Sequence, residues 1–131
     1  MLGGPPHPSL RDLWTAEDEE DVRAFLDACG RDDLLGALLA VEGRSHAERL
    51  EDEAQLTAWA AVAARRLALL PSRGPFALSR LLRGLLADEL GFRGDADDYS
   101  ATRNCCLHQV LARRKGMPIL LGCVWMEVGR R

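Results

Sequence analysis

The sequence lacks an excess of basic charge, a long apolar run and a leader-like start, and these absences narrow its possible functions. Its 131 residues carry 17 Lys and Arg against 20 Asp and Glu, a net charge of −3. Nucleic-acid binding and docking on an anionic membrane are therefore not expected. The apolar runs 119–121 and 123–126 are far too short to span a membrane. Residues 1–8 show no basic segment followed by an apolar one, so no signal peptide is expected.

Cysteine is also scarce. Four cysteines, of which Cys105 and Cys106 are adjacent, do not make the framework of a secreted disulfide-rich protein, so we expect a reduced, cytoplasmic setting. A content of 47% hydrophobic and 28% charged residues predicts a globular fold with its own core. We expect residues 1–9 to form a disordered N-terminal arm and residues 10–131 a single helical domain.

Helix signals dominate the chain, and no segment alternates with the period of two that marks a half-buried strand. Thr15 precedes a run of acidic residues, which favours a helix start. Ser45 and Glu48 have the spacing of a capping box and open a segment that we expect to break near Glu53, because only its second half is apolar. The expected helices cover residues 15–30, 33–42, 45–70, 75–91, 104–115 and 118–128.

The last two helices and the loop before them attract most of the functional interest. Asn104 is a good N-cap for the fifth helix, and residues 119–128 are apolar on almost every side, which is typical of a buried helix. The connection 94–101 is rich in aspartate, but it lacks the ligand ladder and the terminal glutamate of a calcium loop. We therefore expect a solvated loop, anchored to the body by Tyr99, and no metal site.

Four motifs in the last third of the chain have a familiar order. They are Asp97-Asp98-Tyr99, Arg103-Asn104, the basic turn 113–116 followed by Pro118 and Ile119, and Glu127 followed by Arg130 and Arg131. Together they resemble the signature stretch of the SirB-one-type transglutaminase-like family. The helices before Leu90 are similar in layout to that family's helical lead-in, so the resemblance covers about residues 32–131.

The resemblance implies more chain than is present here. In that family the helical part is followed by a β-rich half with a Gly-His-Phe stretch, which completes a papain-like α+β fold. We therefore expect this chain, all-α as it stands with about six helices, to correspond to the helical N-terminal half of a longer fold.

The resemblance also implies where a nucleophile would stand. Active transglutaminase-like enzymes place a cysteine at the start of the central helix, after a Gly-x turn, where the helix amides favour a thiolate. The corresponding turn here is Gly116-Met117-Pro118, so Pro118 occupies the nucleophile's place. The family's histidine and aspartate would lie downstream. We expect no cysteine-triad catalysis and no cofactor.

Cys105, Cys106 and His108 are the remaining candidates for catalysis. If Asn104 caps the fifth helix, both thiols fall in its first turn, where the pKa of a thiol is lowered. Cys105 would then share a helix face with His108, as a nucleophile and its base require. The three groups could also bind a metal, although a tetrahedral site needs a fourth ligand from elsewhere. We favour ordinary packing over both alternatives.

Glu127 needs a partner if its helix is buried. Arg113, Arg114 or Arg103 would supply one through a bidentate pair. We favour a structural ion pair between two helices; the alternative is a polar site for a peptide or small ligand, lined by Arg103, Asn104 and Glu127. The full set of candidate binding residues is Asp98, Tyr99, Arg103, Asn104, Arg113, Arg114 and Glu127.

Three hypotheses about function follow. The leading one is a non-catalytic domain with a regulatory or protein-interaction role, whose partner the sequence does not identify. The second is a cysteine-dependent hydrolase or acyltransferase that is complete only in a longer chain. The third is a homodimer formed through the C-terminal helix, because an uncovered apolar face favours self-association.

Overall fold

The computed structural model describes residue 3 and residues 13–131, and these residues fold into helices. A π-helical segment follows the fourth α-helix and a 3₁₀ turn precedes the fifth. The α-helices are α1 (Ala16–Gly30), α2 (Leu34–Val41), α3 (His46–Ala68), α4 (Pro75–Leu82), α5 (Leu107–Arg113) and α6 (Pro118–Arg130). No strand occurs within this described part of the chain, so the all-α prediction is confirmed. The expected arm at residues 1–9 lies, apart from residue 3, outside the described residues.

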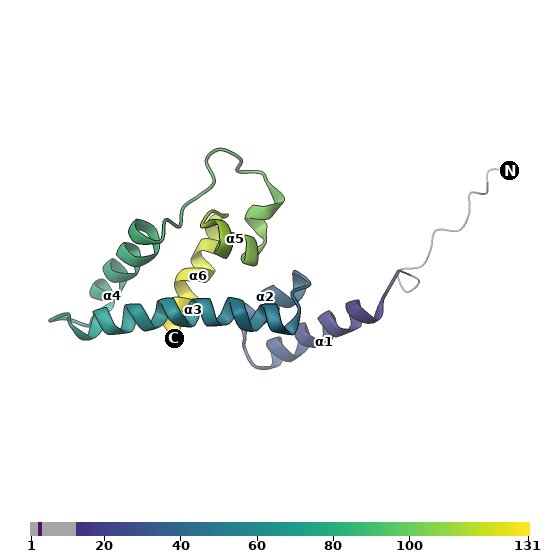
Figure 1. Ribbon diagram of the computed structural model, residues 1–131, viewed down its shortest axis with the longest axis horizontal. Helices are drawn as coiled ribbons and strands as arrows, with labels where there is room; N and C mark the ends of the chain where they lie inside the picture. The colour runs from purple at the N-terminus through teal and green to yellow at the C-terminus, as the bar shows by residue number, and fades with distance from the viewer. Residues whose placement is uncertain (1–2, 4–12) are drawn as a thin grey trace.

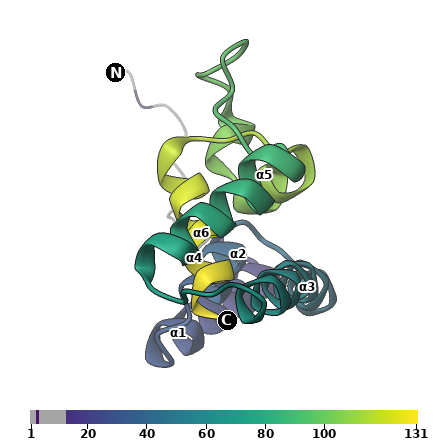
Figure 2. The same ribbon diagram turned by 90° about the vertical axis from the view of Figure 1, so that its left-hand side faces the viewer.

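The helices make an elongated molecule. Figure 1 shows α3 running along the long axis, with α1 towards one end and α4 at the other. The C-terminal helix α6 contacts α3, α4 and α5, and Figure 2 shows the same arrangement viewed from the α4 end. Among the described residues, no helix combines the length and the apolar character that crossing a membrane requires.

Local capping sets the start of α1 as predicted. Thr15 and Asp18 form a capping box, in which the Asp18 N–H donates to Thr15 Oγ1 at 3.2 Å and the Thr15 N–H donates to Asp18 Oδ2 at 2.7 Å. The helix packs on α2, but Ala28 is its one buried residue. The capping box therefore sets where α1 begins, and its contact with α2 holds the helix in place.

The expected break in α3 near Glu53 is wrong. The capping box of Ser45 and Glu48 forms as predicted, and the helix then continues without interruption to Ala68. Its buried residues begin near the middle of the helix, and α6 packs against α3: Leu56, Trp59, Ala60 and Ala63. The polar first half stays helical because adding a residue to a capped, existing helix is far easier than nucleating a new one.

The fourth predicted helix forms in two parts. α4 passes directly into a π-helical segment, Arg83–Glu89, in which the neighbours Leu85 and Leu86 are both buried. The segment closes with the Leu90 N–H donating to the Leu85 carbonyl at 2.9 Å, and Gly91 follows with a φ of 77°. Gly91 thus ends the helix as predicted, because glycine adopts this left-handed conformation without a Cβ penalty.

The core lies where α3, α6 and the segment after α4 meet. Trp59 packs edge-to-face on Phe92 with ring centroids 5.5 Å apart, and Phe92 packs in the same way on Trp125 at 6.2 Å. Leu86, Val110 and Val124 surround these rings and are almost completely buried. The core thereby fixes the position of the chain that leads into α6.

Candidate functional site

The loop at residues 94–101 is anchored by a buried carboxylate. Asp95 is only 2% exposed, and its Oδ2 accepts a 2.9 Å hydrogen bond from Arg113 Nη2. The Arg113 guanidinium holds the pKa of the Asp95 carboxyl below its ordinary value of 3.8. The expectation that Tyr99 anchors the loop is wrong, because the Tyr99 residue is 60% exposed. Burial of Asp95 is tolerated because the guanidinium pairs with it.

Asn104 is not the N-cap of the fifth helix, which corrects the prediction. It lies in the 3₁₀ turn Thr102–Cys105, and α5 begins at Leu107 with Cys106 as its N-cap residue. Asn104 is 1% exposed, so its amide group must find hydrogen bonds inside the protein rather than at a helix end.

Asn104 instead ties the loop to α5. Its Nδ2 donates to the carbonyl oxygens of Asp98 at 2.7 Å and Tyr99 at 3.1 Å. Its Oδ1 accepts from Arg113 Nη1 at 3.1 Å. We call Asp95, Asn104 and Arg113 the loop clamp. Each of these side chains is used to hold the backbone or another member of the clamp.

The turn from α5 to α6 is closed by tight packing. The Met117 N–H donates to the Asn104 carbonyl at 3.1 Å, so the loop clamp also holds the start of α6. Gly116 is buried, and a Cβ at this position would lie 2.5 Å from Cγ2 of Val110. The glycine predicted to end the fifth helix is therefore required by a close approach to a core side chain.

Arg114 and Lys115 do not join the predicted polar site. The Arg114 guanidinium lies over the rings of Trp59 and Phe92, 4.6 Å and 5.2 Å from their centroids. Burial lowers the pKa of Arg114. Lys115 approaches the exposed Asp97 carboxylate at 3.8 Å. The three basic residues 113–115 thus have three separate structural roles.

The start of α6, where the family resemblance implies a nucleophile, holds a proline. Pro118 is in the first turn, and the N-cap residue Met117 makes no side-chain capping bond. The nearest thiol contact is that of Cys105 Sγ with Met117 Sδ, at 3.0 Å. Proline provides no atom that could attack a carbonyl group.

The two adjacent thiols do not lie in the first turn of α5 as expected. Cys105 is exposed in the 3₁₀ turn, and Cys106 precedes α5. Burial raises the pKa of the Cys106 thiol, and the Glu42 carboxylate and Cys105 raise it further. The predicted lowering of the thiol pKa is therefore wrong for Cys106, since both burial and negative charge oppose a thiolate.

His108 pairs with a residue that sequence reasoning missed. The Glu42 carboxylate, at the C-terminal end of α2, lies 2.6 Å from His108 Nδ1 and accepts the backbone N–H of His108 at 3.0 Å. It also accepts the N–H of Leu107. Glu42 thus caps the N-terminus of α5, which has no cap of its own. No local pattern could reveal this, because the two helices are far apart in sequence.

Glu127 does not pair with Arg113, Arg114 or Arg103, so the predicted ion pair is wrong. Its carboxylate accepts from Arg130 Nη2 at 2.8 Å and lies 3.5 Å from Arg131 Nη2. The reason is distance along α6: nine residues separate Glu127 from the helix start, about 13 Å. Arginines three and four residues later are on the same face and reach it first.

Five of the seven predicted binding residues therefore lie together, and the other two lie apart from this group. Arg103 completes the group with a 3.6 Å contact from its Nη2 to Asp98 Oδ2 at the exposed rim of the loop. The residues brought together are Asp98, Tyr99, Arg103, Asn104 and Arg113. Arg114 and Glu127 lie elsewhere, so the hypothesis of a polar site shared by Arg103, Asn104 and Glu127 is wrong.

The expectation that residues 119–128 are buried on nearly every side is also wrong. Leu120 and Val124 face the core, but Ile119 is 72% exposed and Met126 63% exposed. Gly122 lies on the same side and is exposed. We call Ile119, Gly122 and Met126 the α6 stripe. It is an uncovered apolar surface on an otherwise packed helix.

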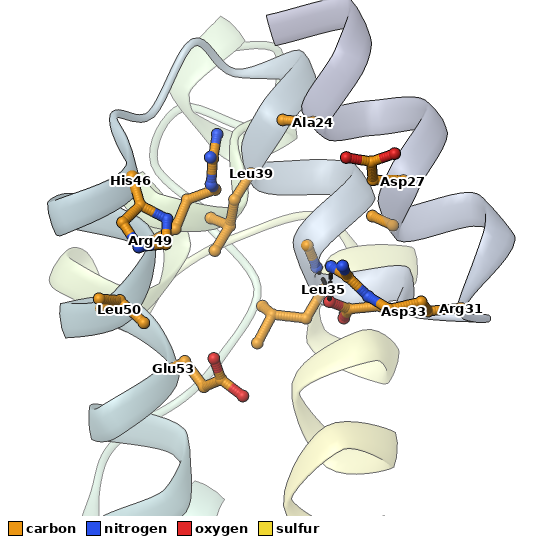
Figure 3. A pocket seen from close by; sticks show the side chains of 12 residues that line it. Ala24, Asp27, Arg31, Asp33, Leu35, Leu39, His46, Arg49, Leu50 and Glu53 are labelled. Atoms are coloured by element: carbon orange, nitrogen blue, oxygen red, sulfur yellow. Dashed lines mark hydrogen bonds and ion pairs between the residues drawn. The ribbon is translucent and has the colours of Figure 1, made fainter. Parts of the chain in front are cut away.

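A cavity that the sequence did not indicate lies between α1, α2 and α3. It has a volume of about 260 Å³ and contains none of the predicted site residues. Figure 3 shows its polar side chains coming from α1, from the turn between α1 and α2, and from α3: Asp27, Arg31, Asp33, His46, Arg49 and Glu53. Within the described ranges, no group of three or more His, Cys, Asp or Glu residues is placed to hold a metal ion.

Comparison with known proteins places the chain in a family. The sequence pattern of the transglutaminase-like superfamily matches residues 51–131. The chain is 34% identical over 114 residues to a UPF0162 protein of Vibrio cholerae serotype O1, covering 82% of this chain and 41% of that relative. A UPF0162 protein of Xylella fastidiosa is 46% identical over 46 residues, which is 35% of this chain and 16% of the relative.

A further relative is a eukaryotic protein. F-box only protein 21 of Mus musculus is 40% identical over 47 residues, which is 36% of this chain and 8% of the relative. The chain thus spans about two-fifths, or less, of the length of these relatives. No solved structure matches it. On the match of residues 51–131, the chain belongs to the transglutaminase-like superfamily.

Proposed function

We propose that this chain is a non-catalytic, SirB-one-type member of the superfamily, with a regulatory or protein-interaction role. The observation that carries the proposal is Pro118 at the start of α6, the place that the family resemblance assigns to the nucleophilic cysteine of active members. The nearby thiols do not replace it. Burial raises the pKa of the Cys106 thiol, which opposes a thiolate there.

The loop clamp supports the same proposal. Asn104 bonds the carbonyl oxygens of the loop, and Arg113 bonds Asn104 and the Asp95 carboxylate, so these side chains hold the loop and one another. Within residues 13–131, no buried side-chain polar atom lacks a hydrogen-bond partner. Active sites commonly keep such groups in reserve. The clamp is instead satisfied, which is typical of a structural role.

The test is a single-turnover assay with amide and ester substrates. We expect the wild-type chain to release product no faster than the buffer does, with Cys105→Ala and Cys106→Ala indistinguishable from it. A rate above buffer that either substitution abolishes would overturn the proposal.

The interaction surface in this proposal is the α6 stripe, and its partner is a second copy of the chain. Ile119 and Met126 flank Gly122, whose missing side chain allows two helices to approach closely. A second copy can match this face with its own through a two-fold axis. We expect Met126→Glu to abolish dimerisation in sedimentation velocity and Met126→Leu to retain it. A monomeric wild type at high concentration would contradict the dimer.

The second candidate is a cysteine-dependent hydrolase or acyltransferase that is complete only in a longer chain. One observation favours it: Glu42 holds His108 through Nδ1, which leaves Nε2 available as a base. It requires a thiol that ionises near neutrality. Iodoacetamide alkylation across pH tests this, and four thiols that react only above about pH 8 would exclude it.

A further inference from the structure

Charge is segregated along the molecule, although the net charge is only −3. Residues 13–33 contain eight acidic residues and two arginines, whereas residues 65–84 contain five arginines and no acidic residue. The acidic segment includes α1, and the basic segment includes the end of α3 and α4. Figure 1 places these elements at opposite ends of the long axis. The overall balance of charge therefore hides an arginine-rich end, where Glu89 pairs with Arg66.

The basic end contains an apolar groove. The groove has a volume of about 490 Å³ and lies between the end of α3, the following turn and α4. Its apolar lining includes Leu70, Ala77, Leu81 and Leu85. Two further apolar residues beside it, Leu69 and Phe76, are 85% and 88% exposed. Exposed apolar residues around an apolar groove are typical of a docking site.

The arginines around this groove are largely uncommitted. Arg66 lines the groove and forms an ion pair with Glu89. Arg80 also lines it and is exposed, and no carboxylate of the described residues lies within ion-pair distance of its guanidinium. The same holds for Arg83 one turn later. We call the groove and its lining arginines the basic groove (Leu70, Ala77, Leu81, Leu85, Arg66 and Arg80); Arg83 does not line it but follows Arg80 on the next turn.

We infer that the basic groove binds an acidic amphipathic helix of a partner protein. Apolar side chains at helical spacing fit the lining of Leu81 and Leu85, as in other helix-in-groove complexes. Carboxylates on the flanks of such a helix would meet Arg80 and Arg83, which have no acidic partner. A flat anionic bilayer fits less well, because the apolar lining is concave and Leu85 is buried in it. This surface is separate from the α6 stripe.

The test uses the full chain and two synthetic helical peptides with identical apolar positions. One peptide carries glutamate at all of its remaining, non-apolar positions, and its twin carries lysine at the same positions. In fluorescence anisotropy we expect the glutamate peptide to bind, with an affinity that falls as sodium chloride increases, and the lysine twin not to bind. Equal binding of both peptides, or binding of neither, would overturn the inference.

Two variants locate the binding site. Arg80→Glu/Arg83→Glu is expected to weaken binding of the glutamate peptide roughly tenfold or more. Its matched control, Arg23→Glu/Arg93→Glu, makes the same charge change at exposed residues outside the groove and leaves the affinity within about twofold. An unchanged affinity in the first variant, or an equal loss in the control, would contradict the proposed site.

Gly84→Leu tests the groove without changing charge. Gly84 lines the groove, and a Cβ at this position would meet no atom within 4 Å. The added side chain should fill the groove and abolish peptide binding while circular dichroism stays unchanged. Met126→Glu in the α6 stripe should leave peptide binding intact. The dimer proposal and the peptide proposal can therefore be refuted separately. Co-sedimentation with phosphatidylserine vesicles but no peptide binding would overturn the inference in favour of a membrane.

Discussion

Helix α1 and the corner between α5 and α6 are held in opposite ways. The cap of α1 comes from Thr15 and Asp18, residues within its own first turn, and the helix buries only Ala28. The start of α5 is capped by Glu42, which is 65 residues away, and the corner is fixed by the loop clamp. The first region therefore depends on its own cap and on α2, its neighbour in sequence. The corner between α5 and α6 is stable only when segments far apart in the sequence are in contact.

The comparison predicts that a destabilising substitution in the corner lowers the stability of the whole domain. A destabilising substitution in α1 should affect α1 alone. Packed elements with shared hydrogen bonds unfold together, whereas a helix with few buried contacts opens on its own. The four predictions that follow test this difference, and they run from the largest expected effect to the smallest.

Asn104→Ala should produce the largest effect. It removes the side chain that holds the carbonyls of Asp98 and Tyr99 and leaves Arg113 short of an acceptor in a buried setting. We expect a loss of about 3 kcal/mol in the free energy of unfolding, measured in urea. Tyr99→Ala, at an exposed position of the same loop, is the control and should change stability by less than about 0.5 kcal/mol. Equal effects would mean that the loop clamp does not hold the corner.

Gly116→Ala should rank second. The new methyl group would overlap Val110, which is fully buried and cannot move aside. We expect a loss of about 2 kcal/mol by thermal or urea unfolding. Gly30→Ala is the paired control, because a Cβ there meets no atom within 4 Å. It should be neutral or stabilise α1 by up to about 1 kcal/mol. Destabilisation by both would point to a general intolerance of alanine rather than to this contact.

Thr15→Ala should have a smaller and local effect. It removes the N-cap of α1, at a cost of about 1 kcal/mol to that helix. Hydrogen exchange should become faster for the amides of α1 and stay unchanged for those of α5. Faster exchange in both helices would show that α1 and the corner unfold as one unit, against the comparison.

The smallest effect should be a pH dependence of the free energy of unfolding that comes from the Asp95–Arg113 pair in the corner. Arg113 lowers the pKa of Asp95 in the folded state, so the unfolded chain binds this proton more readily. The stabilisation is therefore complete above the ordinary pKa and is lost as pH falls through the lower, folded value. The stability gap between wild type and Asp95→Asn should be constant near neutrality and should narrow below about pH 4. A gap that is independent of pH would exclude the ionised pair.

The same contrast explains how far the sequence could predict the structure. The caps at Thr15 and Ser45 and the helix end at Gly91 were predicted correctly, because each depends on residues within one turn. The role of Asn104 was not, since its amide serves a buried network rather than a helix end. A good N-cap residue and a good network residue have the same side chain, and only tertiary contacts distinguish them.

The candidate site shows the same limit. The motifs in the last third correctly drew attention to Asp98, Asn104 and Arg113, which the structure brings together. They did not predict the partner of Glu127, because the competition between arginines depends on helix geometry. Glu42 was missed altogether, since nothing near it in sequence marks a carboxylate as the cap of a distant helix.

That cap has a consequence for the order in which the chain folds. α5 has seven residues, too few to nucleate in isolation, and its amides find their acceptor only after a loop of about 65 residues has closed. Contacts of such high sequence separation form slowly, because the entropy of closure is lost before the contact is gained. We therefore expect α1 and α3 to assemble early and α5 to be the last helix to form. In this order of folding, α5 becomes stable only after the end of α2 has packed beside it and Glu42 has bound its first N–H groups.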